Sequence, residues 1–512
     1  MIQYKSTRNN IKLCSFLDVI LKGIANDGGL FVPEKIPKFS LRQLRLLSKK
    51  SYQERAIFIF NLFEPDLSEN TIRKIVNTAY STNFDTTLIA PSIHLKDNQY
   101  VLELWHGPTS AFKDMALQIM PLLFSEAVKE KNKKLVNKGE KPIHYLILVA
   151  TSGDTGKAAL EGFKDRKGVS IIVFYPYGHV SRLQELQMIT QNGLNVEVCA
   201  IHGDFDAVQS LVKDIFNDSK FNKKLFNQYQ VLLSSANSIN WGRLIPQIIY
   251  HINAYIDLVN KQVITLGSQI DIAIPTGNFG NTLAAYYAKK MGLPIRKFIC
   301  ASNENNVLTE FLQTGIYNIK KRKLVQTPSP SMDILIASNI ERLLYTISND
   351  PKKVSFWINQ LKIERKFEVD NLTKGILKKE FYADWVSNKD CLLNIKKLYD
   401  ETKYLMDPHT SVAQAIVERY QKQKSISSPV IICSTAHWAK FAKDVCRALT
   451  KSINDDMLDE FEILKRIKRI TKASIPKNIL ELKRKAIKHR KKYNPNTKLI
   501  GDKIINWLKN TQ

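Results

Sequence analysis

Lys113 is the residue of this 512-residue chain whose surroundings most favour covalent chemistry. It lies in the run His-Gly-Pro-Thr-Ser-Ala-Phe-Lys-Asp (106–114), where an alternating strand ends in a turn and a helix is expected to begin near Ser110. A helix start disfavours a cation by roughly 0.3–1 kcal/mol, and burial beside aromatic rings also lowers a lysine pKa. An amine with a lowered pKa can form a Schiff base. The plainer interpretation is a solvated lysine, with Glu103 and Asp114 either tuning it or pairing with surface lysines.

Two loops have the composition of anion-binding turns between a strand and a helix. The first contains Thr151, Ser152, Gly153, Asp154 and Thr155, and the second contains Gly277, Asn278, Phe279, Gly280 and Asn281. Backbone N–H groups at a helix start bind phosphate or carboxylate, and glycine lets a ligand approach the backbone closely. Ordinary βα turns use the same small residues. An ATP-binding P-loop is excluded at Gly156-Lys157, because the preceding glycine is too close and Ala158 replaces the magnesium-binding Ser or Thr.

Further polar residues follow other apolar runs. Thr435 comes directly after the run 430–433, in Ser-Thr-Ala-His. Asn237 and Arg243 lie in Asn-Ser-Ile-Asn-Trp-Gly-Arg, and because a guanidinium suits bidentate phosphate contact, both are suggested as ligands of a substrate phosphate. Each site has a structural alternative, since Thr435 and Asn240 are both suitable helix caps.

Alternating strands and helices are predicted to position these loops. Apolar runs and helical patterns alternate from about 140 to 302, which is typical of βαβ units and a parallel sheet. The predicted strands cover 143–150, 169–175, 195–200, 231–235, 270–274, 297–302 and 430–433. The predicted helices cover 156–164, 181–192, 204–217, 240–258, 281–291 and 439–449. We therefore predict an α/β protein in which these loops lie between strands and helices.

Composition and charge restrict the class of protein. With 44% hydrophobic residues the chain can bury sizeable cores, but no apolar run approaches the ~18 residues of a membrane span. The first residues lack the apolar core of a signal peptide, so a cytoplasmic protein without a membrane partner is expected. The net charge of +28 fits nucleic-acid binding, codon bias towards lysine, or steering of an anionic substrate. Codon bias is favoured over nucleic-acid binding, because no binding module is recognised.

The six cysteines support neither a disulfide framework nor a metal site. They stand at positions 14, 199, 300, 391, 433 and 446, without the close spacing that zinc ligands require. Cys199, Cys300 and Cys433 end apolar strand-like runs and are predicted to be buried thiols. No metal is expected.

Taken together, the motifs resemble those of threonine synthase, a pyridoxal-phosphate (PLP) enzyme of the tryptophan-synthase-like fold. The runs that carry the resemblance are Ser6 to Arg8, Asp27 to Pro33, His106 to Asp114, Ala150 to Gly156, Ser235 to Asn240, Gly277 to Asn281 and Ser434 to His437. In order and spacing they cover about residues 4 to 450. The usual Pro-Ala-Lys-Phe of the family is Trp-Ala-Lys-Phe here, at 438–441.

The resemblance implies a role for each motif. Lys113 would hold PLP as a Schiff base and act as the base for the Cα and Cβ protons. The 277–281 loop would hold the PLP phosphate, Thr435 would contact the pyridine nitrogen, and the 151–155 loop would hold the substrate carboxylate. The implied reaction converts O-phospho-L-homoserine and water into L-threonine and phosphate, the last step of threonine biosynthesis, with PLP as electron sink.

The resemblance also implies an architecture of two parallel-sheet α/β domains. We expect an N-terminal segment (1–85), a large PLP-binding domain (86–135 and 236–450), a small α/β domain (136–235) and a basic helical tail (451–512). Within the tail a proline-led helix is predicted over 476–492, with its apolar side packed on the body. A monomer or a homodimer is expected.

Two other functions are compatible with parts of the pattern. One is a threonine-synthase-like PLP phospho-lyase or dehydratase that eliminates without adding water at Cβ and gives a 2-oxo acid. The other is a nucleic-acid-binding protein on an inactive PLP fold, motivated by the net charge and the basic tail. The intact Lys113 and both anion-binding loops argue against the second alternative.

Overall fold

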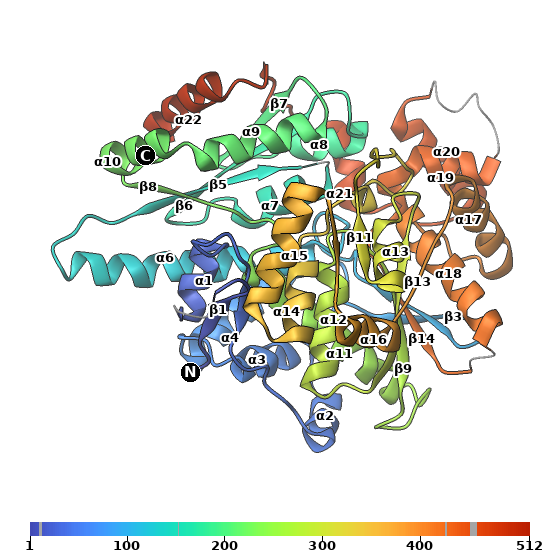
Figure 1. Cartoon of the computed structure of the whole chain (residues 1–512). Helices are drawn as coiled ribbons and strands as arrows, with labels where there is room; N and C mark the ends of the chain where they lie inside the picture. Colours follow the sequence, from blue (N-terminus) through green and yellow to red (C-terminus); the bar gives the residue numbers. More distant parts are fainter. Residues whose placement is uncertain (10–12, 152, 425–426, 451–457, 512) are drawn as a thin grey trace.

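The structure is a computed structural model that describes the chain except residues 10–12, 152, 425–426, 451–457 and 512. Two parallel sheets form its centre, with helices packed around each of them (Figure 1). Many helices begin at a Ser or Asp whose side chain accepts an N–H from the first turn, as Ser51 and Ser181 do in full capping boxes. The two predicted parallel-sheet layers are confirmed.

The larger sheet has six strands in the order β13-β10-β9-β14-β4-β3. Their bounds are β3 (Ser92–Lys96), β4 (Gln99–Glu103), β9 (Ile270–Pro275), β10 (Ile295–Ser302), β13 (Phe381–Trp385) and β14 (Val430–Ser434). Neighbouring strands are parallel, except that β3 pairs antiparallel with β4. The central strands β9 and β14 are buried along their whole length, as expected for parallel strands covered on both faces.

Helices from distant parts of the chain cover this sheet. They include α5 (Asp114–Leu117), α11 (Trp241–Asn260), α12 (Gly280–Met291), α17 (Asn388–Thr402), α18 (Pro408–Lys424) and α19 (Ala442–Thr450), which is preceded by the 3-10 turn η2 (Trp438–Phe441). Helices α12 and α18 pack directly on its central strands, and α11 packs on α12. The carboxyl ends of β9 and β14 consequently open towards the starts of α12 and η2.

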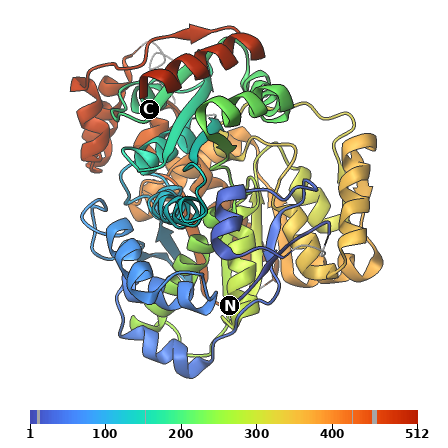
Figure 2. The same ribbon diagram turned by 90° about the vertical axis from the view of Figure 1, so that its left-hand side faces the viewer.

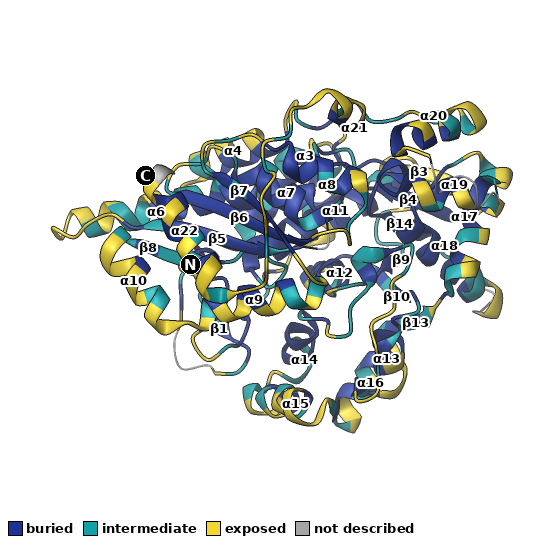
Figure 3. Ribbon diagram, turned by 90° about the horizontal axis from the view of Figure 1, so that it is seen from above, coloured by how far each residue is buried: buried dark blue, intermediate teal, exposed yellow. Residues whose placement is uncertain are grey.

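The smaller sheet has five parallel strands in the order β15-β7-β6-β5-β8. They are β5 (His144–Ala150), β6 (Val169–Pro176), β7 (Val196–Ile201), β8 (Val231–Ser234) and β15 (Lys492–Tyr493). The helices around it are α6 (Met120–Val136), α7 (Asp154–Phe163), α8 (Arg182–Ile189), α9 (Phe205–Asn217), α10 (Ser219–Tyr229) and α22 (Thr497–Thr511). Figure 3 shows β5 and β6 buried beneath helices whose outer faces are exposed.

The remaining elements surround these two layers. The N-terminal segment comprises β1 (Tyr4–Ser6), α1 (Phe16–Lys22), β2 (Phe31–Pro33), α2 (Leu41–Ser48), α3 (Tyr52–Leu62) and α4 (Glu69–Ala79). A subsidiary group contains α13 (Val307–Thr314), β11 (Ile316–Asn318), η1 (Pro330–Met332), α14 (Ile340–Ser348), α15 (Pro351–Glu364), β12 (Lys366–Glu368) and α16 (Asn371–Glu380). Figure 2 shows the N-terminal segment and the C-terminal helix in different parts of the molecule, the latter beside the smaller sheet.

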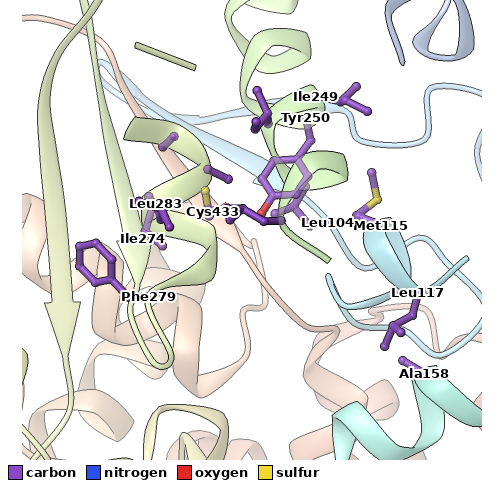
Figure 4. Packing of buried hydrophobic residues seen from close by; sticks show 14 of the residues in the cluster. Leu104, Met115, Leu117, Ala158, Ile249, Tyr250, Ile274, Phe279, Leu283 and Cys433 are labelled. Atoms are coloured by element: carbon purple, nitrogen blue, oxygen red, sulfur yellow. The ribbon is translucent and has the colours of Figure 1, made fainter. Parts of the chain in front are cut away.

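One hydrophobic core continues beneath both layers. Figure 4 shows buried side chains from α5, α7, β9, α11, α12 and β14 packed near one another, among them Met115, Tyr250 and Cys433, together with Leu104, which directly follows β4. A second cluster lies where α9, α10 and α22 cover the smaller sheet. All six cysteines are buried, which confirms the burial predicted from the sequence for Cys199, Cys300 and Cys433. None of the helices in the described part of the chain has the length and hydropathy to cross a membrane.

The C-terminal tail is helical, but its predicted helix over 476–492 is wrong. The structure has α20 (Glu460–Thr471), then only α21 (Lys477–Leu480) and the 3-10 turn η4 (Glu481–Arg484). The segment then leaves the helical path and adds β15 beside β7. The expected packing is confirmed for Ile479 and Leu482, which are buried, whereas Leu480 is 47% exposed. The domain limits stay a proposal, with β15 joining the sheet of the small domain.

Candidate active site

A cleft of about 400 Å³ lies where the carboxyl ends of β5, β9 and β14 meet. Parallel sheets bind ligands at such strand ends. The cleft is lined by Lys113, Thr151, Asp154, Thr155, Asn237, Arg243, residues 275–282, residues 330–334 and Thr435. Of the candidate site residues that the structure describes, all but Gly153 line this cleft. A separate groove of about 470 Å³ between α4, α6 and the 165–168 turn contains none of them.

Lys113 lies on the wall of this cleft and is 8% exposed. Helix α5 begins at Asp114 rather than near Ser110, because Ser110 has a left-handed φ of 58° that no helix accommodates. The Lys113 amine is 3.4 Å from Asp154 Oδ2 and 3.2 Å from Ser331 Oγ. Burial lowers the pKa of this amine, and the nearby cations Lys440 and Arg243 lower it further, against the opposing effect of Asp154.

Asp154, at the start of α7, is the polar centre of the site. Its carboxylate forms an ion pair with Lys440 Nζ at 2.8 Å and accepts hydrogen bonds from Gln184 Nε2 and Ser331 Oγ, both at 3.1 Å. Burial alone would raise the pKa of Asp154, but Lys440 and Lys113 hold it below its usual range. Asp154 is thus an anion between two buried lysines.

The two acidic residues that the sequence suggested as partners of Lys113 point elsewhere. Asp114 accepts hydrogen bonds from the backbone N–H and the hydroxyl of Thr109, and burial raises its pKa to about 6. Glu103 is bonded to His106 and Tyr404. Neither pairs with Lys113, nor with a surface lysine among the described residues. The sequence did not indicate that Asp154 pairs with Lys113 instead, because the two residues are 41 positions apart in the chain.

The loop containing Asp154 has a compact turn stabilised by its own residues. Thr151 Oγ1 accepts the backbone N–H groups of Gly153 at 3.0 Å and Gly156 at 2.9 Å. Gly153 has φ 133°, and a Cβ there would lie 2.6 Å from the Gln184 side chain, so only glycine fits. Thr155 faces the cleft, whereas Ser152 lies outside the described residues.

Loop 277–281 leads from β9 into α12 and forms the opposite wall of the cleft. A Cβ on Gly277 would lie 2.6 Å from the carbonyl oxygen of Ser331. Phe279 has a left-handed φ of 63°, and α12 begins directly after it at Gly280. Asn278 and Asn281 also line the cleft, and the Asn281 carboxamide oxygen contacts His251 Nε2 at 2.9 Å. The start of a twelve-residue helix at a cleft suits an anionic group.

Arg243 and Asn237 lie at the start of α11, on the cleft wall. Arg243 is 3% exposed, and its Nη1 donates to the carbonyl oxygen of Ala236 at 2.8 Å. Its Nε has no acceptor in the part of the chain that the structure describes, and burial lowers its pKa to about 10. A buried cationic donor without an acceptor fits an anionic ligand. Asn240 caps α11 through the backbone N–H of Gly242, so its structural alternative is confirmed.

Thr435 follows β14 and lines the cleft, and its carbonyl oxygen accepts the Phe112 N–H at 2.8 Å. The alternative that Thr435 caps the next helix is wrong, because η2 is capped by the His437 side chain. Lys157 forms an ion pair with Glu161 at 2.7 Å, which agrees with the exclusion of a P-loop lysine at this position. No group of three or more potential metal ligands occurs among the residues described.

Sequence reasoning missed three residues of the site. Ser331 bonds to Asp154 and Lys113, and its backbone N–H donates to His409 Nε2 at 3.2 Å. His409 is oriented in turn by Asp407, whose carboxylate contacts His409 Nδ1 at 2.6 Å. Lys440 was visible only as the lysine of Trp-Ala-Lys-Phe. Ser331 and His409 lie in polar stretches that carry no periodic or motif signal.

Comparison with known proteins decides the family. The family models "Threonine synthase N terminus" and "Threonine synthase, C-terminal" match residues 3–80 and 410–487. Threonine synthase of Saccharomyces cerevisiae is 38% identical over 512 residues, covering 93% of this chain and 97% of the yeast protein. The chain belongs to the threonine synthase family. Its fold class and the resemblance predicted from sequence are thereby confirmed.

Other threonine synthase relatives add two facts. The threonine synthase-like 1 protein of Macaca fascicularis is 43% identical over 470 residues, covering 90% of this chain but only 61% of that protein. The chain thus spans about three fifths of the length of that relative. The crystal structure of PLP-bound threonine synthase from Brucella melitensis has a TM-score of 0.85 and 31% identity, with full coverage of both chains.

Proposed function

We propose that this protein is a threonine synthase that converts O-phospho-L-homoserine and water into L-threonine and phosphate. One observation carries the proposal: a buried amine of lowered pKa, Lys113, faces a cleft bordered by the starts of α7 and α12 in a threonine synthase fold. An amino-acid phosphate ester presents a carboxylate and a phosphate, which match two such sites. A cytoplasmic location and a monomer or homodimer stay predictions.

The residues of the cleft fit pyridoxal phosphate as cofactor. The Brucella relative has PLP bound, and in this chain Lys113 would hold its aldehyde carbon. The 277–281 loop would hold the phosphate, because Gly277 permits close backbone approach and α12 begins at Gly280. Thr435 would contact the pyridine nitrogen. When bound, PLP supplies an electron sink for carbanions at Cα and Cβ of the substrate.

In the proposed mechanism the protein binds the substrate and moves its protons. Backbone N–H groups at the start of α7 bind the carboxylate, while Arg243 and Asn237 bind the γ-phosphate. The Lys113 amine removes the Cα proton, which its lowered pKa allows because a neutral amine is needed. It would pass this proton to the bound cofactor and, neutral again, take a Cβ proton. After phosphate leaves Cγ, a proton is returned to Cγ, the hydroxyl of water adds at Cβ and a proton is returned to Cα, while the remaining proton of that water goes to the released phosphate.

Asp154 keeps the Lys113 amine in place during these transfers. The carboxylate is held at 3.4 Å from the amine by Lys440 and Gln184, so that the ammonium formed on proton uptake has a counter-ion. Ser331 Oγ lies within hydrogen-bond reach of both groups. The amine is thus oriented in either protonation state.

A second candidate function is kept because some relatives are named threonine synthase-like rather than threonine synthase. The threonine synthase-like 1 protein of Macaca fascicularis is 43% identical to the chain, against 38% for the yeast enzyme, so the alternative is a threonine-synthase-like phospho-lyase or dehydratase that gives a 2-oxo acid. Fold, cofactor and Lys113 would be the same, and only the fate of the intermediate would differ. Incubation of purified protein with PLP and O-phospho-L-homoserine, followed by product identification, separates the two: threonine supports the first, and 2-oxobutanoate with ammonia supports the second.

The cofactor proposal is tested independently of the product. The Schiff base of the purified holoprotein should absorb visible light. Reduction with borohydride should leave the cofactor covalently attached to Lys113. Lys113→Ala should lose turnover but retain weak PLP binding through the 277–281 loop. Cofactor attached to another lysine, for instance the buried Lys440, would overturn the role of Lys113.

The ring contact of Thr435 needs its own experiment. Thr435→Asp would place a carboxylate where a neutral hydroxyl lies, which favours a protonated pyridine and diverts intermediates into side reactions. The ratio of 2-oxo acid to threonine should therefore rise. Normal turnover with an unchanged ratio would show that Thr435 does not touch the ring.

A further inference from the structure

The turn that precedes Lys113 adopts a conformation that its own sequence disfavours. Ser110 has φ 58°, a left-handed value that costs a non-glycine residue on the order of 1 kcal/mol or more. Two backbone hydrogen bonds contribute to holding it: the Ser110 N–H donates to the nearby Gly107 carbonyl at 3.1 Å, and the N–H of His437, far along the chain, donates to the Ser110 carbonyl at 3.1 Å. Such a conformation persists only where the surroundings fix it.

A residue from the far end of the chain supplies a further contact. Asn478 Nδ2 donates to the Pro108 carbonyl oxygen at 2.7 Å and lies 3.0 Å from Ser110 Oγ. The Ser110 hydroxyl is also 3.2 Å from Asn478 Oδ1. One carboxamide therefore joins both residues of the turn, across 368 residues of sequence.

Asn478 is itself held firmly against the body of the protein. It lies on the short helix α21, whose Ile479 and the following Leu482 are 1% and 3% exposed in the main hydrophobic core. The side chain of Lys477, next to it, is 91% exposed, so the carboxamide points inward while its neighbour is solvated. Helix α21 can thus transmit a fixed position to the turn.

We propose that Asn478 is a positioning residue for Lys113. By holding Pro108 and Ser110 it fixes the point at which α5 begins, and Lys113 immediately precedes that helix. The amine consequently stays buried in the cleft, facing Asp154 of α7, Lys440 of η2, Arg243 of α11 and the Ser331 hydroxyl. This role concerns the placement of the amine and is independent of which product the enzyme forms.

The test measures the Lys113 amine directly in PLP-free protein. Acylation by acetic anhydride at a series of pH values, quantified by mass spectrometry of the Lys113 peptide, gives the midpoint of its titration. Asn478→Ala and the isosteric Asn478→Asp both remove the donor to Pro108. Because loosening the turn admits water and relieves the burial that dominates the titration, both variants should raise the midpoint, by about one unit.

Two control variants distinguish an effect on the placement of the Lys113 amine from an effect on the stability of the whole protein. Lys477→Ala alters the neighbouring exposed residue and should leave the midpoint unchanged. Ile500→Ala removes buried apolar contact from α22, in the separate cluster beside the smaller sheet, so it should lower the melting temperature without moving the midpoint. Amide exchange at Ser110 and His437 should increase in the Asn478 variants only.

The proposal is overturned if the midpoint and the two exchange rates in Asn478→Asp equal those of wild type. It is equally overturned if Ile500→Ala shifts the midpoint as much as Asn478→Ala does, because the effect would then follow from general loosening. Should Asn478→Ala not fold, the isosteric Asn478→Asp decides. A raised midpoint in both Asn478 variants together with normal values in both controls supports the proposal.

Discussion

His106, in the turn before Lys113, lies between two carboxylates. Its Nδ1 is 2.5 Å from Asp85 and its Nε2 is 2.9 Å from Glu103, while its ring stacks on Trp105 with centroids 4.1 Å apart. Burial alone would lower the pKa of His106, but the hydrogen bonds to Asp85 and Glu103 outweigh this effect and raise it to about 9. The imidazolium therefore carries a positive charge at neutral pH.

This charge makes stability depend on pH above neutrality. A histidine whose pKa is higher in the folded state adds to the free energy of unfolding. This contribution is fully present below the unfolded pKa of about 6.5, and it is lost as the pH rises through the folded pKa of about 9. The free energy of unfolding of wild type should fall across this window by roughly 2 kcal/mol more than that of His106→Gln. Urea unfolding at pH 6, 7.5 and 9.5 measures it, with the exposed His94→Gln as control. Parallel pH curves for wild type and His106→Gln would refute the prediction.

At the scale of single elements, the loop before α12 has no room for a side chain at Gly277. Gly277→Ala would place a methyl group 2.6 Å from the Ser331 carbonyl oxygen, so the segment that contacts Lys113 has to move. We expect PLP affinity to fall at least tenfold, as measured by equilibrium titration of the absorbance. Gly375→Ala is the matched control: Gly375 lies in α16 with open space around it, and alanine should stabilise the helix by about 0.5–1 kcal/mol. Equal PLP affinity for both variants would contradict the prediction.

The start of α8 is held by a glutamate from the C-terminal segment. Glu460 accepts the backbone N–H groups of Arg182 at 3.1 Å and Leu183 at 2.8 Å, and it is 6% exposed. Glu460→Ala leaves two partly or fully buried donors unsatisfied and should lower the free energy of unfolding by about 1–2 kcal/mol. Glu462→Ala, on the exposed side of the same helix, should change it by less than about 0.5 kcal/mol. Chemical denaturation of the two variants side by side checks the difference, and equal effects would refute it.

For the whole molecule, the basic tail is a packed part of the fold. Helix α22 contributes Ile500, Ile504 and Leu508, each fully buried, to the cluster beneath α9. A chain ending at Ile475 should expose this cluster and melt at a clearly lower temperature. Replacing the exposed Lys488, Arg490 and Lys491 by alanine should change the melting temperature little. An unchanged melting temperature on truncation, together with steep salt-dependent DNA binding by the full chain, would instead assign the tail to nucleic acid.

What the sequence revealed followed from local signals. The strand-like runs before residues 151 and 277 predicted which loops follow strands of the sheets. The motif around Lys113 predicted that this lysine lies at the site. Both predictions were possible because each pattern spans only about ten consecutive residues. Ser331, His409 and Asn478 were not foreseen, since their partners lie 78 to 370 residues away. The helix predicted over 476–492 was wrong because its apolar side is interrupted: Ile479 and Leu482 are buried, Leu480 is exposed, and the next apolar residue that packs on the core is the partly buried Ile487.

Strand β15 has a consequence for the order in which the protein folds during synthesis. The edge of β7 that it covers ends at Ile201, about 290 residues before Lys492 and Tyr493 leave the ribosome. At typical elongation rates of about 5–20 residues per second, that edge stays unpaired for roughly 15 to 60 s. An open strand edge invites pairing with another chain. The nascent smaller sheet therefore keeps an open edge at the end of β7 until Tyr493 has been made.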